Sequence, residues 1–195
     1  EERFLNCLLG YCRPDARANA STVFQLLDTF AALPLERCTA AQLETLLHFA
    51  ETSAHAQELP VRTAAALLLR RLRSSAQQTA HVYAALEKMD CADSLSLTLL
   101  RGGLLSGETA CLPDETISDI FLDNLKTATP WIIKQVNILL LTEHAHAGGA
   151  QVLHIAAHLS NLIKVSDRVT VRHSAGAALL ELAPLLSVDQ RNEIA

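Results

Sequence analysis

Apolar residues recur along most of the chain at the three- and four-residue spacing of an amphipathic helix. In the segment 40–55 the recurring positions are Leu43, Leu46, Leu47 and Ala50, which together form one buried helix face. The segment 149–164 repeats this pattern at Val152, Ile155, Ala156, Leu159, Leu162 and Ile163. Extended over the chain, the periodicity predicts helices at about 2–11, 15–32, 40–55, 60–74, 77–89, 92–105, 114–126, 130–143, 149–164, 168–184 and from 188 onward.

Residues at the boundaries of these segments support the predicted ranges. Thr39 is a good N-cap for the third helix, and Pro60 suits the first turn of the fourth. Pro184 ends the tenth helix, and Ser187 opens the last. Helices with short connections are therefore expected throughout.

The composition favours an all-α fold. Hydrophobic residues make up 50% of the 195 residues and charged residues 19%, which is typical of a packed protein and not of a disordered one. Leu and Ala, which are good helix formers, supply most of the apolar positions, while only 4% of residues are aromatic.

A short phrase recurs in the sequence and indicates repeated structure. Val61–Leu69 returns as Val171–Leu180, each with a branched apolar residue, a basic residue, small residues and then leucines. Looser copies lie at 16–20 and 133–137. The basic residues of the four copies are 45, 72 and 38 residues apart, and the long step contains one further helix at 93–100 that lacks the basic residue. The mean step is about 39 residues, near that of two-helix repeats.

This phrase resembles the HEAT repeat of the HEAT/armadillo family, most clearly at 60–72 and 167–182. The resemblance implies a right-handed α-solenoid with about five two-helix repeats, plus a partial sixth, as one domain over 1–195. Because the first residue is not Met and the last helix stops soon after it begins, we expect the chain to be a fragment of a longer one. The repeats are expected at about 1–35, 36–76, 77–112, 113–147 and 148–186, with the partial one at 187–195. In that family the second helices line the concave face, and Asp and Arg link neighbouring repeats, a role that we assign to Arg62, Asp167 and Arg172.

Stacked repeats create an extended concave wall, which predicts a binding surface. The second-helix positions expected on this wall form a basic ladder of Arg17, Arg62, Lys134 and Arg172, to which the amide of Asn137 adds a further contact residue. Such a ladder suits a protein or peptide partner, especially an acidic or phosphorylated one. The same cations equally suit an internal role, in which they offset Asp and Glu between repeats. We therefore expect a non-enzymatic interaction scaffold.

The alternative function is a nucleic-acid-binding protein, or a DNA-glycosylase-like repair enzyme, on the same scaffold. Its fragments would be Trp131 beside Lys134 and Asp167 beside Arg172. The net charge of −5 disfavours a broad nucleic-acid surface.

Four of the eight histidines, His144, His146, His154 and His158, are close in sequence. His154 and His158 are four apart and share a helix face, which makes them weak metal-ligand candidates. The first two are expected in the turn before that helix. Because the helical pair lies off the apolar stripe, solvent exposure explains it equally well, and no metal is expected.

No catalytic, phosphate-binding or dinucleotide motif is found in the sequence, so neither an enzyme nor a cofactor is expected. The five cysteines show no metal-like spacing, which favours reduced thiols in a cytoplasmic protein. No apolar run is long enough for a membrane span.

Overall fold

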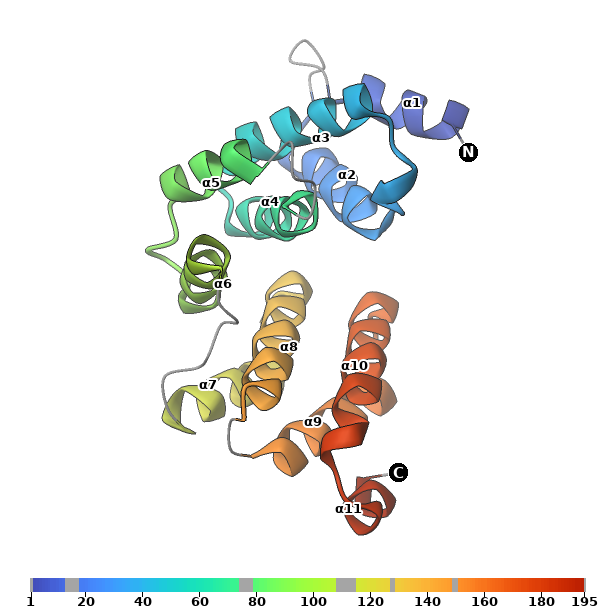
Figure 1. The fold of residues 1–195 in the computed structure, drawn as a ribbon, viewed down its shortest axis with the longest axis vertical. Helices are drawn as coiled ribbons and strands as arrows, with labels where there is room; N and C mark the ends of the chain where they lie inside the picture. The colour runs from blue at the N-terminus through green and yellow to red at the C-terminus, as the bar shows by residue number, and fades with distance from the viewer. Residues whose placement is uncertain are drawn as a thin grey trace. The chain divides into compact units, whose positions relative to one another are not determined.

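The computed structural model describes six stretches of the chain, 2–12, 18–73, 79–107, 115–126, 129–148 and 151–194. All regular structure in these residues is helical, without a β-strand, which confirms the predicted all-α fold (Figure 1). The chain forms two compact units, Glu1–Leu105 and Ser106–Ala195. The prediction of one continuous solenoid stays a prediction.

The helices follow the predicted order. The first unit contains α1 (Glu2–Gly10), α2 (Ala20–Ala32), η1 (Leu35–Arg37), α3 (Ala40–Ser53), α4 (Leu59–Leu72), α5 (Thr79–Lys88) and α6 (Leu95–Ser106), whose last residue begins the second unit. The second unit contains α7 (Glu115–Lys126), α8 (Trp131–His146), α9 (Val152–Val165), α10 (Val169–Leu182), η2 (Ala183–Leu185) and α11 (Val188–Ile194).

Capping side chains begin several helices where the sequence predicts them. Thr39 accepts a hydrogen bond from the backbone N–H of Gln42 at 3.3 Å, and the Gln42 side chain accepts one from the Thr39 N–H at 2.8 Å. Ser187 and Gln190 exchange the same pair of bonds at the start of α11. These reciprocal bonds satisfy backbone donors that a helix start otherwise leaves free.

Some boundaries differ from the prediction. Helix α2 begins at Ala20, because Asn19 accepts a bond from the Thr22 N–H and caps it there. Helix α6 begins at Leu95, after a turn in which the Ser94 hydroxyl accepts from the Leu97 N–H. Helix α8 continues to His146, and the chain turns at Gly148, whose φ of 84° favours glycine.

The first unit packs its helices in two layers. Helices α3 and α4 pair, α2 packs beside α4, and α3 packs beside both α1 and α5 (Figure 1). Its core includes Leu27, Phe30, Leu46 and Leu68, all without solvent exposure. The Phe30 ring meets the edge of Phe49 at a centroid distance of 6.3 Å.

The second unit repeats this arrangement. Helix α10 packs against α9 and beside α8, α7 packs against α8, and α9 packs beside α7 and α11 (Figure 1). Phe121, Val136, Leu140, Ile155 and Leu159 are fully buried in its core. In both units, odd-numbered helices therefore lie beside odd-numbered ones and even-numbered beside even-numbered ones.

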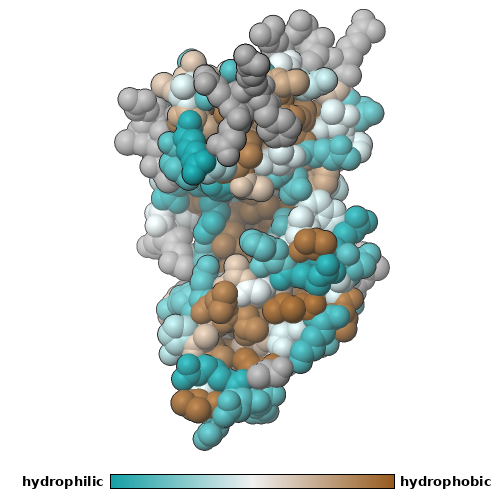
Figure 2. Space-filling model, turned by 90° about the vertical axis from the view of Figure 1, so that its right-hand side faces the viewer, coloured by the Kyte–Doolittle hydropathy of each residue, from teal (hydrophilic) through white to brown (hydrophobic). Residues whose placement is uncertain are grey.

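Apolar side chains also reach the surface of the second unit. Large exposed examples are Val165, Val169, Leu180, Leu185 and Val188. On the face in Figure 2, hydrophobic side chains in the lower part of the molecule are separated by hydrophilic ones. They do not gather there into one continuous apolar patch.

Candidate binding site

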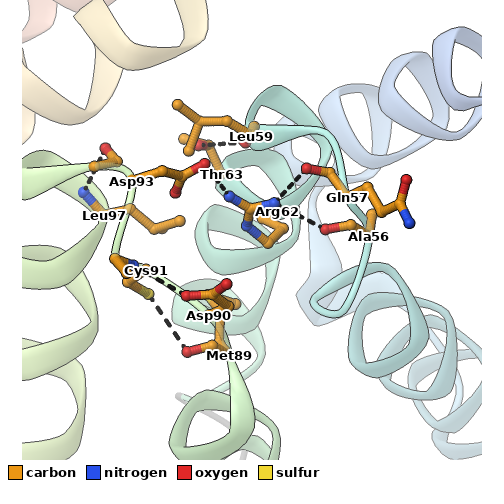
Figure 3. Close-up of polar contacts among 12 residues, drawn as sticks. Ala56, Gln57, Leu59, Arg62, Thr63, Met89, Asp90, Cys91, Asp93 and Leu97 are labelled. Atoms are coloured by element: carbon orange, nitrogen blue, oxygen red, sulfur yellow. Dashed lines mark hydrogen bonds and ion pairs between the residues drawn. The ribbon is translucent and has the colours of Figure 1, made fainter.

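Arg62, the basic residue of the first clear phrase, holds the turn that precedes its own helix. Its side chain is buried in α4, where Nη1 donates to the carbonyl oxygens of Ala56 and Gln57 at 2.9 and 2.5 Å (Figure 3). Nη2 pairs with the carboxylate of Asp93 at 2.5 Å. Asp93 lies in the turn between α5 and α6, so Arg62 links two successive helical segments.

Arg172 makes the equivalent contact in the second phrase. Its Nη1 donates to the carbonyl oxygen of Ser166 at 2.6 Å, six residues earlier in the chain. Arg62 reaches Ala56 across the same separation. The two copies of the phrase thus share one structural contact, in which a guanidinium satisfies a turn carbonyl.

The contact with Arg62 affects the titration of Asp93. The hydrogen bond from Arg62 lowers the pKa of the Asp93 carboxyl below its ordinary value. Desolvation opposes this effect, and the charge of Arg62 adds a smaller lowering. The Asp93 side chain is 52% exposed, whereas that of Arg62 is 5% exposed. The buried partner is therefore the cation.

Lys134 and Asp167 are spaced along the second unit much as Arg62 and Asp93 are along the first. Asp93 follows Arg62 by 31 residues, and Asp167 follows Lys134 by 33. Both residues line one pocket of about 330 Å³, together with Leu125, Lys126, His158, Asn161, Leu162, Val165 and Ser166. Within the described residues, neither the Lys134 ammonium nor the Asp167 carboxylate forms a hydrogen bond or ion pair. Lys134 and Asp167 therefore do not form the ion pair that links Arg62 to Asp93, and we call this an open link.

The other groups of this pocket come from two layers. Lys126 ends α7 and pairs with Asp123 at 3.3 Å, while His158 and Asn161 project from α9. Burial lowers the pKa of His158, and the charges of Lys126 and His154 lower it further, against an opposing effect of Asp123. Lysine side chains thus border the pocket from α7 and α8, and Asp167 borders it from the turn before α10.

The remaining residues of the predicted basic ladder lie elsewhere. Arg17 is outside the described residues. Arg62 is 4% exposed and Asn137 is fully buried, so neither presents its polar atoms to a partner, contrary to what their sequence positions suggest. Arg172 is half-buried and holds Ser166. Of the ladder, only Lys134 lines the pocket.

A side-chain hydrogen bond also links helices α8 and α10. Gln135 on α8 donates a hydrogen bond to the Ser174 hydroxyl on α10 at 3.2 Å. Trp131, which begins α8, is half-buried.

The histidines differ from their predicted placement in one respect. His144 and His146 belong to α8 and not to a turn, because that helix is longer than predicted. His144 is buried, which lowers its pKa. His154 and His158 share one face of α9, as predicted. In the described part of the chain, His, Cys, Asp and Glu side chains form no group of three or more that is suited to a metal ion.

Sequence reasoning overlooked three residues of this description. Asp93 stands shortly before α6 just as Asp167 stands shortly before α10, and this position was a usable signal. Lys126 and Asn161 have no such signal in the sequence. They belong to α7 and α9, which lie outside the repeated phrase.

The chain matches no protein-family model, and no curated protein or solved structure matches it. Over the residues that the structure describes, none of the helices combines the length and apolar character needed to cross a membrane.

Proposed function

We propose that the chain is a non-enzymatic interaction scaffold, and that an acidic segment of a protein partner docks in the pocket of Lys134 and Asp167. The scaffold is a right-handed α-solenoid of about five HEAT-like repeats with a partial sixth. The alternation of odd and even helices within each unit supports this arrangement, since stacked hairpins place equivalent helices side by side. The shared contact of Arg62 and Arg172 supports the equivalence of the two phrases.

The observation that carries the binding site is the open link between Lys134 and Asp167. Arginine fills the corresponding position in the first unit and closes it with three hydrogen bonds. Lysine has a single ammonium group in place of the planar fork and does not reproduce these bonds. An unpaired cation beside an unpaired anion in a pocket favours a ligand that brings its own charge and hydrogen-bonding groups.

The charges in the pocket favour an acidic side chain of the partner. Lys134 supplies an ammonium group that has no protein partner among the described residues, whereas the ammonium group of Lys126 is paired with Asp123. The amide of Asn161 and the hydroxyl of Ser166 add donors. A volume of about 330 Å³ suits one or two side chains, since it lies at the small end of ligand pockets. The carboxylate of Asp167 then orients the ligand by accepting a backbone or side-chain N–H.

A nucleic-acid-binding function draws no support from this pocket. Asp167 lies among its lysines, and the chain carries a net charge of −5.

The described cysteines Cys7, Cys12, Cys38 and Cys91 are free thiols, which fits the cytoplasmic location that we propose.

Selection from a random peptide library tests the proposal. The wild type is expected to enrich peptides that contain Asp or Glu, and Lys134→Ala is expected to lose this preference. Lys164→Ala is the matched control, because Lys164 is an exposed lysine of α9 outside this pocket. Equal enrichment of acidic peptides by all three proteins, or no acidic preference in the wild type, would refute the site.

A further inference from the structure

We propose that His154 and His158 form a two-histidine binding site for a divalent late transition-metal ion, copper(II) or zinc. The site shares His158 with the lining of the peptide pocket, but it does not rest on the proposed peptide binding. It uses two imidazoles from a single helix, so its geometry is set by α9 alone.

The imidazole rings are already placed for chelation. The two Nε2 atoms are 3.1 Å apart, and the ring centroids are 4.8 Å apart with an interplanar angle of 32°. Residues four apart on a helix project from the same side one turn apart, which brings these nitrogens together. One imidazole donates its Nε2–H to the other in the absence of metal, so on binding that ring must take the tautomer that carries its proton on Nδ1.

The separation of the nitrogens fits the bond lengths of metal–imidazole complexes. An ion about 2.05 Å from each nitrogen, an ordinary Zn–N distance, would see the two at an angle of about 98°. This value lies between the ~90° of adjacent ligands in a square-planar copper site and the ~109° of a tetrahedral zinc site. The separation of the two nitrogens therefore suits either ion.

The surroundings of the two imidazoles admit a metal ion. His154 is exposed and His158 half-buried, so an ion reaches them from solvent. The titratable groups that act on His158 are His154, Lys126 and Asp123. Lys126 opposes a cation, but its ion pair with Asp123 offsets that charge.

The remaining coordination positions stay open to water. No third His, Cys, Asp or Glu of the described residues completes the set. Late transition metals bind imidazole ligands in the order copper(II) above zinc, and we expect that order here.

Calorimetric titration with copper(II) and with zinc tests the site. One ion of either metal is expected to bind per chain at micromolar concentration, with copper the tighter. The titration is made after alkylation of the exposed thiol of Cys7, so that the thiol does not compete. His154→Ala and His158→Ala should each weaken binding at least tenfold, because either change leaves one ligand.

Two further variants make the result decisive. His173→Ala removes an exposed histidine of α10 and should leave the affinity unchanged. His154→Gln keeps the size and polarity of the side chain and should lose affinity for the metal as His154→Ala does.

Nitrogen hyperfine structure from two imidazoles is expected in the electron paramagnetic resonance spectrum of the copper complex. Wild-type affinity in either His154 variant, or no binding at 100 µM metal (about 100 times the expected concentration), would overturn the proposal, whatever the outcome of the peptide selection.

Discussion

Replacing Arg62 by methionine should destabilise the first unit much more than neutralising its partner Asp93. Methionine fills a similar volume but removes every hydrogen bond of the guanidinium. Two of these bonds go to the turn carbonyls of Ala56 and Gln57, and one goes to Asp93. Bonds to a charged donor contribute about 1.5–3 kcal/mol each, but the turn carbonyls become hydrated after the change. We expect Arg62→Met to lower the free energy of unfolding by about 2–4 kcal/mol.

Asp93→Asn should cost about 0.5–1 kcal/mol, because the Asp93 side chain is 52% exposed and water screens its charge. Asparagine retains an acceptor for Arg62, so this variant removes the charge alone. Urea unfolding followed by circular dichroism measures both changes. A loss below 1 kcal/mol for Arg62→Met, or equal losses for the two variants, would refute the conclusion that the buried guanidinium holds the turn.

The difference between wild type and Asp93→Asn should also depend on pH. Arg62 lowers the folded-state pKa of the Asp93 carboxyl, so the stabilisation is complete above the unfolded pKa of about 3.9. It should decline as the pH falls toward and through the folded-state pKa and then disappear. A difference that persists unchanged to strongly acidic pH would contradict this assignment.

Three more predictions concern packing, capping and thiol chemistry. Phe30→Ala should lower the free energy of unfolding by about 3–5 kcal/mol, because the ring is fully buried. Thr39→Ala should lower it by about 1 kcal/mol through loss of the cap; urea titration measures both, and unchanged midpoints would contradict them. A thiol reagent at pH 8 should label exposed Cys7 much faster than Cys12, whose pKa burial raises to about 12; equal rates would contradict this order.

The fold was largely predictable from local patterns. Apolar spacing places the helices, and capping residues such as Thr39 and Ser187 place their starts, because both signals act within a few residues. The end of α8 was harder to predict, since His144 is polar yet buried inside the helix. Its burial depends on neighbouring helices, which sequence periodicity does not show.

The binding site was only partly predictable. The recurring phrase identifies Lys134 and Arg62 as equivalent, but it does not show that Arg62 is buried and Lys134 borders a pocket. The pocket beside Lys134 is completed by Lys126 and Asn161, which α7 and α9 bring there. Tertiary contacts between layers decide which basic residue is available to a partner.

The central claim is that lysine at position 134 leaves open a link that arginine closes in the first unit. Thermal unfolding and peptide binding of Lys134→Arg test it together, because the longer forked side chain should reach Asp167 and occupy the pocket. We expect the melting temperature to rise by about 2–4 °C, which corresponds to about 1 kcal/mol, while affinity for a selected acidic peptide falls at least tenfold. An unchanged melting temperature with undiminished peptide affinity would contradict the account.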